Sequence, residues 1–237
     1  MTNYDLFAKH YDAVMGEPKA KVAFIENSIK QHKPNTKKVL ELACGTGSIL
    51  KNLEKKYQVF GLDLSSGMLS QAKKKVKSGK FFHQDMTKFK IDEQFDVILC
   101  VFDSINHLLK FNQWQQVFSK VNNHLVDGGI FIFDMNMQEK LDRHIKEKPW
   151  DHWFGKNLLI MDVTDAGNKV SNWNVKVFEH QKKNTFKMYE ENINEKAFPL
   201  SQVKKSLQKY FSKVFVIDPD RKRPSQQSER LFLICKK

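Results

Sequence analysis

Apolar positions follow two different patterns along the chain and divide it into two parts. Up to residue 134, short apolar runs alternate with stretches whose apolar residues recur at helical spacing. The runs predict strands at 37–42, 57–62, 80–83, 95–101 and 129–134. Strands that alternate with helices favour a parallel sheet, so this part indicates an α/β fold.

Two helical patterns precede the first predicted strand. Residues 3–15 place Tyr4, Tyr11 and Met15 on one face, and residues 19–32 do the same with their own apolar side chains. We therefore expect two helices ahead of the sheet.

After residue 134 the alternation with helices stops. Residues 157–197 contain three extended stretches separated by turn-prone segments, which predicts a small antiparallel meander. A helical pattern then leads into runs at 211–217 and 230–235, which could pair as an antiparallel edge of the main sheet. We expect a main domain of residues 1–136 and 198–237, with residues 137–197 inserted as a cap over the active site.

The formal charge of +13 makes nucleic acid a partner to consider, because a basic surface attracts phosphate. The lysines are spread along the chain, and no aromatic residues interleave with them as base stacking requires. A solvated lysine-rich surface is the favoured interpretation, with nucleic acid a possible but disfavoured partner.

The cysteines Cys44, Cys100 and Cys235 lie far apart, without a CxxC pair or a histidine at ligand spacing. Neither a disulfide framework nor a metal site is indicated. The start lacks a basic segment followed by an apolar one, and no apolar stretch reaches membrane-spanning length. We expect a reduced, cytoplasmic protein without a membrane partner.

A glycine-containing turn follows the first predicted strand, which ends in the sequence around Glu41 and continues into residues 43–47. Such a turn lets a ligand approach the backbone. A dinucleotide-binding turn would need a third glycine where Leu50 stands, and no Gly-Lys-Ser/Thr of a phosphate loop follows. The turn alone is also compatible with a strand-to-helix connection that binds nothing.

Acidic residues at the next two strand ends change this picture. Asp63 ends the second predicted strand, where its carboxylate can accept both hydroxyls of a ribose. Asp85 follows the third strand and could accept from an adenine amine, with Met68 and Met86 as apolar walls. Three successive strand ends thus predict one nucleoside pocket.

The segments VLELACGTG, GLDLSSGML, HQDMTKF, FDVILCVFDSINHL and LVDGGIFIFDM resemble the successive motifs of class I S-adenosylmethionine-dependent methyltransferases. The resemblance implies a Rossmann-like, seven-stranded, mostly parallel sheet with helices on both faces. The start, the meander and the end of the chain resemble small bacterial methyltransferases that include amino-sugar N,N-dimethyltransferases.

The resemblance also implies which residues bind S-adenosylmethionine. Glu41, Ala43 and Gly45 would face its methionine part, and Ala43 stands where the family usually has glycine. Asp63 would bind the ribose, and Tyr11 would close the site. The remaining expected cofactor residues are Gly47, Leu64, Met68, Asp85, Met86, Cys100 and Val101.

The segment after the fourth predicted strand is where a methyl acceptor would lie. His107 is the candidate general base, although it could equally cap or pack the next helix. Asp103 and Asn106 are candidates to orient an acceptor amine. The cap residues expected to wall the acceptor are Trp150, His152 and Trp153, which could instead form the cap's own small core.

Missing motifs narrow the acceptor. No Asn/Asp-Pro-Pro-Tyr/Phe follows the fourth strand and no Pro-Cys is present, which disfavours methylation of a nucleobase. The sequence therefore predicts methyl transfer to the N or O atom of a small molecule, by a monomer or homodimer. The alternatives are an RNA methyltransferase and a non-catalytic protein that binds S-adenosylmethionine.

Overall fold

Seven strands form the main sheet of the computed structural model, which describes residue 4, residues 7–225 and residues 227–237. The strands are β1 (Lys38–Leu42), β2 (Gln58–Asp63), β3 (Lys80–His83), β4 (Phe95–Cys100), β5 (Leu125–Asn136), β10 (Lys213–Ile217) and β11 (Arg230–Lys236). Their order is β10-β11-β5-β4-β1-β2-β3. Strands β1 to β5 pair in parallel, whereas β11 pairs antiparallel with β5 and β10.

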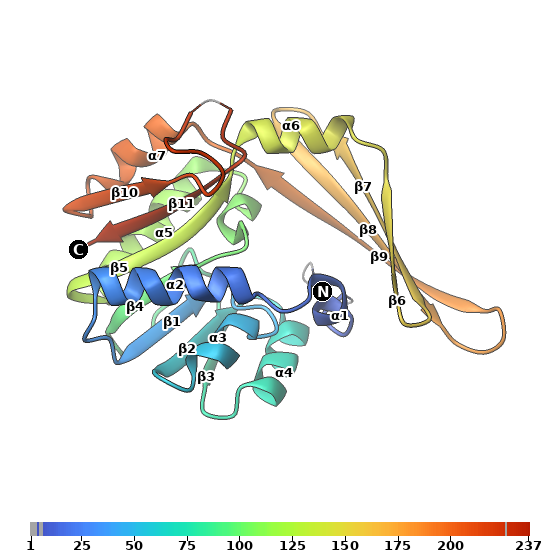
Figure 1. Ribbon diagram of the computed structural model, residues 1–237, viewed down its shortest axis with the longest axis horizontal. Coiled ribbons are helices and arrows are strands. Elements are labelled where there is room, and N and C mark those ends of the chain that lie inside the picture. Colours follow the sequence, from blue (N-terminus) through green and yellow to red (C-terminus); the bar gives the residue numbers. More distant parts are fainter. Residues whose placement is uncertain (1–3, 5–6, 226) are drawn as a thin grey trace.

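Helices cover both faces of this sheet (Figure 1). The helices are α2 (Lys19–His32), α3 (Ser48–Leu53), α4 (Ser66–Lys75), α5 (Phe111–His124) and α7 (Leu200–Leu207). Buried apolar side chains form one cluster between the sheet and α5 and α7, and a second between the sheet and α2, α3 and α4. Successive side chains of a strand point to opposite faces of the sheet, and helices bury both faces. The central strands are therefore apolar almost throughout. The expected fold class is confirmed.

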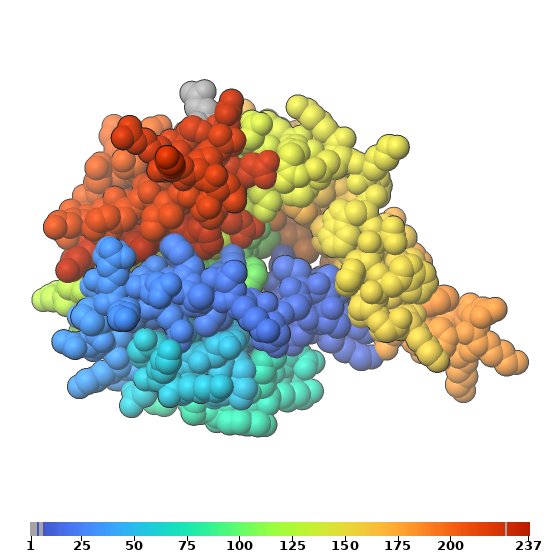
Figure 2. All heavy atoms as spheres, viewed as in Figure 1, coloured from blue at the N-terminus to red at the C-terminus, as the bar shows by residue number. Residues whose placement is uncertain are grey.

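A second, antiparallel sheet lies between β5 and β10 in the chain. Its strands β6 (Trp150–Phe154), β7 (Asn157–Asp165), β8 (Val170–His180) and β9 (Phe186–Lys196) pair in sequence order. The β8–β9 hairpin projects away from the rest of the molecule (Figure 2). The three predicted stretches correspond to β7, β8 and β9.

Two elements of this region were not predicted. Helix α6 (Gln138–Lys146) leaves the end of β5, and β6 is a fourth strand where the sequence suggested only pocket-wall residues. Strand β6 is short and mostly exposed, and it lies at the edge of its sheet. The apolar alternation that reveals a half-buried strand is therefore weak in it.

The predicted N-terminal helix over residues 3–15 is wrong in its extent. Helix α1 comprises only Tyr11–Met15, and residues 1–3 and 5–6 lie outside the described residues. The carboxylate of Glu191 on β9 accepts hydrogen bonds from the backbone N–H groups of Tyr4, at 2.8 Å, and Phe7, at 3.2 Å. These bonds fix the segment against the second sheet, and Tyr4 takes a positive φ of 75° that a helix does not allow.

The N-terminal segment and the second sheet share a small apolar core. It contains Phe7 together with Leu159, Val175, Val177 and Ile193 from the antiparallel strands. Figure 1 shows α1 between the main sheet and β6. No helix among the described residues has the length and apolar character needed to cross a membrane.

The core of the main sheet gives a direct stability prediction. Phe131 on β5 is fully buried and stacks on Phe133 with their ring centroids 4.8 Å apart. We expect Phe131→Ala to lower the free energy of unfolding by about 3–5 kcal/mol, measured by urea denaturation, because it leaves a cavity. Phe186→Ala is the matched control, because Phe186 is 43% exposed and its loss should change stability far less. Equal losses in the two variants would contradict this account of the core.

Candidate cofactor and acceptor site

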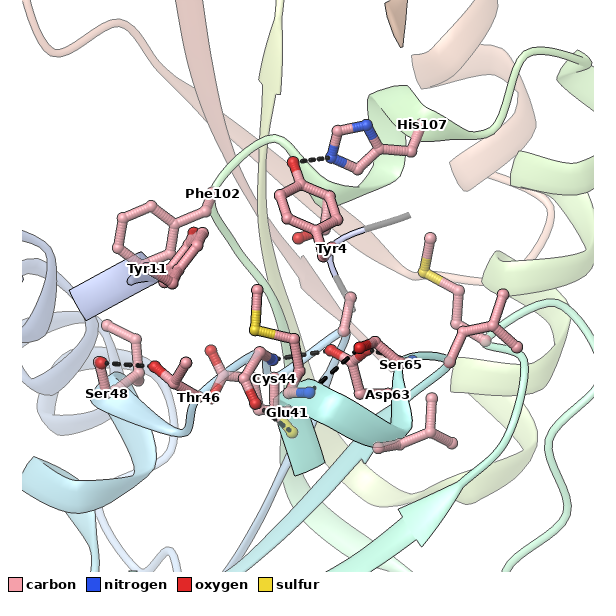
Figure 3. A pocket seen from close by; sticks show the side chains of 18 of the residues that line it. Tyr4, Tyr11, Glu41, Cys44, Thr46, Ser48, Asp63, Ser65, Phe102 and His107 are labelled. Carbon is pink, nitrogen blue, oxygen red and sulfur yellow. Dashed lines mark hydrogen bonds between the residues drawn. The ribbon is translucent and has the colours of Figure 1, made fainter. Parts of the chain in front are cut away.

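A cavity of about 430 Å³ opens at the carboxyl ends of β1 and β2 (Figure 3). This volume is in the range of small-molecule sites. Side chains and backbone from the N-terminal segment, three strand ends and η1 (Ser104–His107) line it. Ligands bind at this edge of open parallel sheets, because the loops that follow the strands gather there.

The glycine-containing turn forms one wall of the cavity. Ala43, Gly45 and Gly47 all have positive φ angles, of 50°, 54° and 75°. A Cβ atom added to Gly45 would meet no described heavy atom within 4 Å, so this wall is open to a ligand. Ala43 adopts a left-handed conformation that glycine takes without strain, which explains why glycine suits this position.

Asp63 at the end of β2 holds the turn in place. Its Oδ2 accepts a hydrogen bond from the Gly45 N–H at 2.7 Å, and its Oδ1 accepts one from the Ser65 N–H at 2.8 Å. The side chain of Ser65 caps α4 by accepting from the Met68 N–H. The carboxylate therefore has a fixed orientation at the cavity wall, as recognition of two vicinal hydroxyls requires.

Glu41 is buried at the end of β1 and also lines the cavity. Its Oε2 has no hydrogen-bond partner among the residues that the structure describes. Burial, reinforced by the neighbouring Asp63, raises the pKa of Glu41 well above its usual value. A buried carboxylate without a partner is costly unless a ligand supplies a donor or a positive charge. The ammonium group of S-adenosylmethionine fits this requirement.

The third strand end contributes Asp85, which lines the cavity with Met86 and Met68. Its Oδ1 accepts hydrogen bonds from the N–H and the hydroxyl of Thr87, at 2.8 and 2.7 Å. These bonds orient the carboxyl group, and the two methionine side chains provide apolar surface beside it. The three acidic strand ends thus meet in one cavity, because β1, β2 and β3 are adjacent in the sheet.

The N-terminal segment covers the cavity, and Tyr4, Tyr11 and Met15 contribute to its lining. Asp12 attaches this segment to the main domain. Its Oδ1 accepts from the hydroxyl of Thr46 at 2.6 Å, and its Oδ2 lies 2.6 Å from Nζ of Lys75 on α4.

His107 lies on the opposite side of the cavity from Glu41 and Asp63 (Figure 3). Its Nε2 is 3.3 Å from the hydroxyl oxygen of Tyr4, and its Nδ1 is 3.4 Å from the carbonyl oxygen of Asn194. Burial lowers the pKa of His107 below its ordinary value, and Asp103 only partly opposes this effect. The imidazole is therefore neutral near pH 7.

Asp103 belongs to a buried ionic cluster rather than to the cavity wall. Arg230 on β11 bonds Asp103 Oδ1 at 2.8 Å and Asp134 Oδ2 at 2.5 Å. The amide of Asn136 donates to Asp103 Oδ2 at 2.8 Å and to Glu195 Oε2 on β9 at 2.9 Å. Burial alone would raise the pKa of Asp103, but the surrounding cations, with Arg230 foremost, hold it below its usual value.

The structure brings most of the predicted cofactor residues together. Those that line the cavity, with the predicted base His107, are Tyr11, Glu41, Ala43, Gly45, Asp63, Leu64, Met68, Asp85 and Met86. Three others lie behind the wall: Gly47 precedes α3, and Cys100 and Val101 are buried in the core.

The expected acceptor residues are placed differently. Asn106 is fully buried, and its side chain bonds the backbone of Asn136 and Lys196, so it joins elements and does not face a ligand. Trp150, His152 and Trp153 lie on β6, outside the cavity lining, and Trp153 is 57% exposed. The assignment of Asn106 is corrected, because backbone groups occupy its side chain, whereas the acceptor role of the three β6 residues stays a prediction.

Several cavity residues were not predicted as site residues. They include Tyr4, Cys44, Thr46, Ser48, Phe102, Ser104 and Leu108. Phe102 and Asp103 have positive φ angles of 60° and 50°, which turn the chain sharply after β4. The quoted motif FDVILCVFDSINHL contains Phe102, but its spacing did not show which side chain would face the cavity. The described residues contain no grouping of side chains suited to a metal ion.

Known proteins resemble the chain both in sequence and in fold. Residues 39–129 match the profile of a methyltransferase-domain family. A candidate methyltransferase of Geobacillus sp. (strain WCH70) is 28% identical over 99% of both chains. The dTDP-3-amino-3,6-dideoxy-alpha-D-glucopyranose N,N-dimethyltransferase of Streptomyces fradiae is 28% identical over 55% of this chain and 45% of its own.

The same agreement extends to a solved structure. The crystal structure of an S-adenosylmethionine-dependent methyltransferase from Clostridium acetobutylicum ATCC 824 is 25% identical, covers 98% of both chains and has a TM-score of 0.85. Its likeness includes the second sheet as well as the main one, because nearly the whole chain is matched. With the acidic strand ends and the open glycine turn, these similarities identify the protein as an S-adenosylmethionine-dependent methyltransferase with a Rossmann-like fold.

Proposed function

We propose that the protein transfers a methyl group to the N or O atom of a small-molecule acceptor, and that an amine is the favoured acceptor. One observation carries this proposal: a single cavity has the carboxylates of Glu41 and Asp63 on one side and the neutral imidazole of His107 on the other. The first side suits a cationic nucleoside cofactor. The second side suits a group that must lose a proton.

Four residues would hold the cofactor. Asp63 would accept hydrogen bonds from the ribose hydroxyls, Glu41 would pair with the ammonium group, and Asp85 with Met86 would contact the adenine. Bound S-adenosylmethionine supplies an electrophilic methyl group on a positively charged sulfur. The protein's task is then alignment, because in-line displacement at carbon depends on the position of the two reacting atoms.

On the acceptor side, His107 would receive the proton that the acceptor releases. An imidazole that burial keeps neutral has a lone pair that can accept a proton at neutral pH. Asp103 would act through space, because its negative charge favours the protonated form of His107. It would not touch the acceptor, since Arg230 and Asn136 occupy its carboxylate oxygens.

The amine is favoured because the dimethyltransferase of Streptomyces fradiae is named for an amino-sugar acceptor. Residues 137–197 would act as the cap that selects the acceptor, since β9 of the second sheet lies beside η1 and bonds Asn106 and His107. A cytoplasmic location remains a prediction from the sequence. The competing hypotheses are RNA methylation and cofactor binding without methyl transfer, and the acceptor screen below distinguishes them from the proposed function.

An acceptor screen tests the proposed function. The purified protein is incubated with S-adenosylmethionine labelled in its methyl group and with dTDP-3-amino-3,6-dideoxy-alpha-D-glucopyranose, its 3-hydroxy counterpart, a metabolite extract or total RNA. We expect label in a small molecule, and label on the amino but not the hydroxy compound would assign N-methylation. Label only in RNA would contradict the proposal, as would cofactor binding with no transfer to any of these.

The ribose contact gives a second prediction. We expect Asp63→Asn to weaken binding of S-adenosylmethionine by about 10–100-fold in calorimetry, because hydrogen bonds to a charged group contribute roughly 1.5–3 kcal/mol. Asp127→Asn is the control, because Asp127 lies on β5 outside the cavity and its side chain is exposed. Undiminished affinity in Asp63→Asn with a normal unfolding curve would remove Asp63 from the cofactor site.

The raised pKa of Glu41 gives a third prediction. The carboxylate binds the cofactor's ammonium group, and the protonated acid does not. Affinity should therefore be complete above the raised pKa and fall as the pH drops through it, at a higher pH than for an ordinary glutamate. Glu41→Gln should bind about 10-fold more weakly at high pH and lose this pH dependence. A wild-type affinity that stays constant down to the ordinary glutamate range would argue against the pairing.

A further inference from the structure

The hydroxyl of Tyr4 stands between His107 and the interior of the cavity. The two side chains meet edge to face, with ring centroids 5.7 Å apart and the Tyr4 oxygen 3.3 Å from His107 Nε2. Tyr4 also lines the cavity, as Figure 3 shows. An acceptor that approached Nε2 directly would have to displace this hydroxyl.

The position of Tyr4 is fixed from several sides. The Glu191 carboxylate on β9 accepts a hydrogen bond from its backbone N–H at 2.8 Å. Its ring also packs against the ring of Tyr11, with centroids 6.1 Å apart. Backbone and ring contacts together orient the hydroxyl toward His107, so the pair is built into the fold by the second sheet.

The hydrogen bonds of His107 define which of its nitrogens carries the proton. The Asn194 carbonyl oxygen near Nδ1 can only accept, so Nδ1 of the neutral ring is the protonated nitrogen. Nε2 therefore has a lone pair and accepts from the hydroxyl of Tyr4. Burial keeps the pKa of Tyr4 well above its usual value, so the hydroxyl retains its proton for this bond.

Resting on the methyl transfer proposed above, we infer that the hydroxyl of Tyr4 is the group that contacts the acceptor, and that His107 accepts its proton through Tyr4. The acceptor gives a proton to the Tyr4 oxygen while the hydroxyl proton moves to Nε2 of His107. Tyr4 ends as it began, and the imidazole becomes imidazolium. One proton leaves the acceptor and one reaches His107, so the transfer is balanced.

The surroundings of Tyr4 and His107 suit this proton relay, in which a proton passes from the acceptor through Tyr4 to His107. Asp103 from the loop before η1 and Asp63 from β2 favour the imidazolium that forms, and the Asn194 carbonyl continues to accept from Nδ1. Burial disfavours a free phenolate at Tyr4, and the charges of Glu195, Asp103 and Glu191 add to this effect on its pKa. A concerted transfer avoids that phenolate, because the oxygen gains a proton as it loses one.

The first test examines the hydrogen bond between Tyr4 and His107 without any acceptor present. In protein labelled with nitrogen-15 histidine, with His107→Gln used to assign the signal, we expect a neutral ring protonated at Nδ1. Tyr4→Phe should shift the Nε2 resonance of His107, because its lone pair loses a hydrogen bond. A ring protonated at Nε2, or an Nε2 signal that does not respond to Tyr4→Phe, would overturn the relay.

The second test places an amine at the acceptor position. The probe is a cofactor analogue in which a nitrogen bearing a 2-aminoethyl arm replaces the methylated sulfur. We expect Tyr4→Phe to weaken binding of this probe by about 10-fold or more. Binding of S-adenosylhomocysteine, which lacks the arm, should change less than about twofold. Tyr189→Phe is the control, because Tyr189 packs on the same small core but lies outside the cavity lining.

The outcomes of the second test separate this inference from the proposed function. Unchanged affinity of the aminoethyl probe in Tyr4→Phe would overturn the acceptor contact and leave methyl transfer standing. Equal weakening of the probe and of S-adenosylhomocysteine would reduce Tyr4 to a packing role and overturn it as well. If neither compound binds the wild-type protein, the proposed function and the inference fail together.

Discussion

The buried pairing of Arg230 with Asp103 and Asp134 is the interaction on which the site depends. One guanidinium group on β11 neutralises two carboxylates from β5 and from the turn after β4. Asn136 extends the cluster to Glu195 on β9, so the main and second sheets share one network. Removing one member would leave an unpaired charge in a low-dielectric interior, which couples the two sheets through electrostatics as well as packing.

This network also explains how a strained turn persists beside the cavity. Phe102 and Asp103 both occupy the left-handed region, which non-glycine residues rarely adopt. The Asp103 N–H bonds Asp134, and Lys21 from α2 pairs with Asp134 and lies 4.1 Å from the centre of the Phe102 ring. These contacts hold the turn in its strained conformation. The turn in turn directs η1 with His107 toward the cavity.

The sequence predicted the main sheet and the cofactor wall because both depend on local signals. Apolar runs revealed each parallel strand, and the position of Glu41 and Asp63 at strand ends placed them at one edge of the sheet. The acceptor side depends on contacts between distant segments, which no local pattern encodes. Tyr4 reaches His107 because Glu191 bonds its backbone and Tyr11 packs against its ring. Asn106 is occupied by backbone groups that become neighbours only in the fold.

The N-terminal segment is attached at two points that differ in their response to solvent. Glu191 holds it to the second sheet through buried or partly buried backbone bonds, whereas Asp12 holds it to Lys75 and Thr46 where its side chain is 46% exposed. Salt screens the exposed attachment far more than the buried one. Rising ionic strength therefore weakens the attachment of the segment to the main domain more than its attachment to the second sheet.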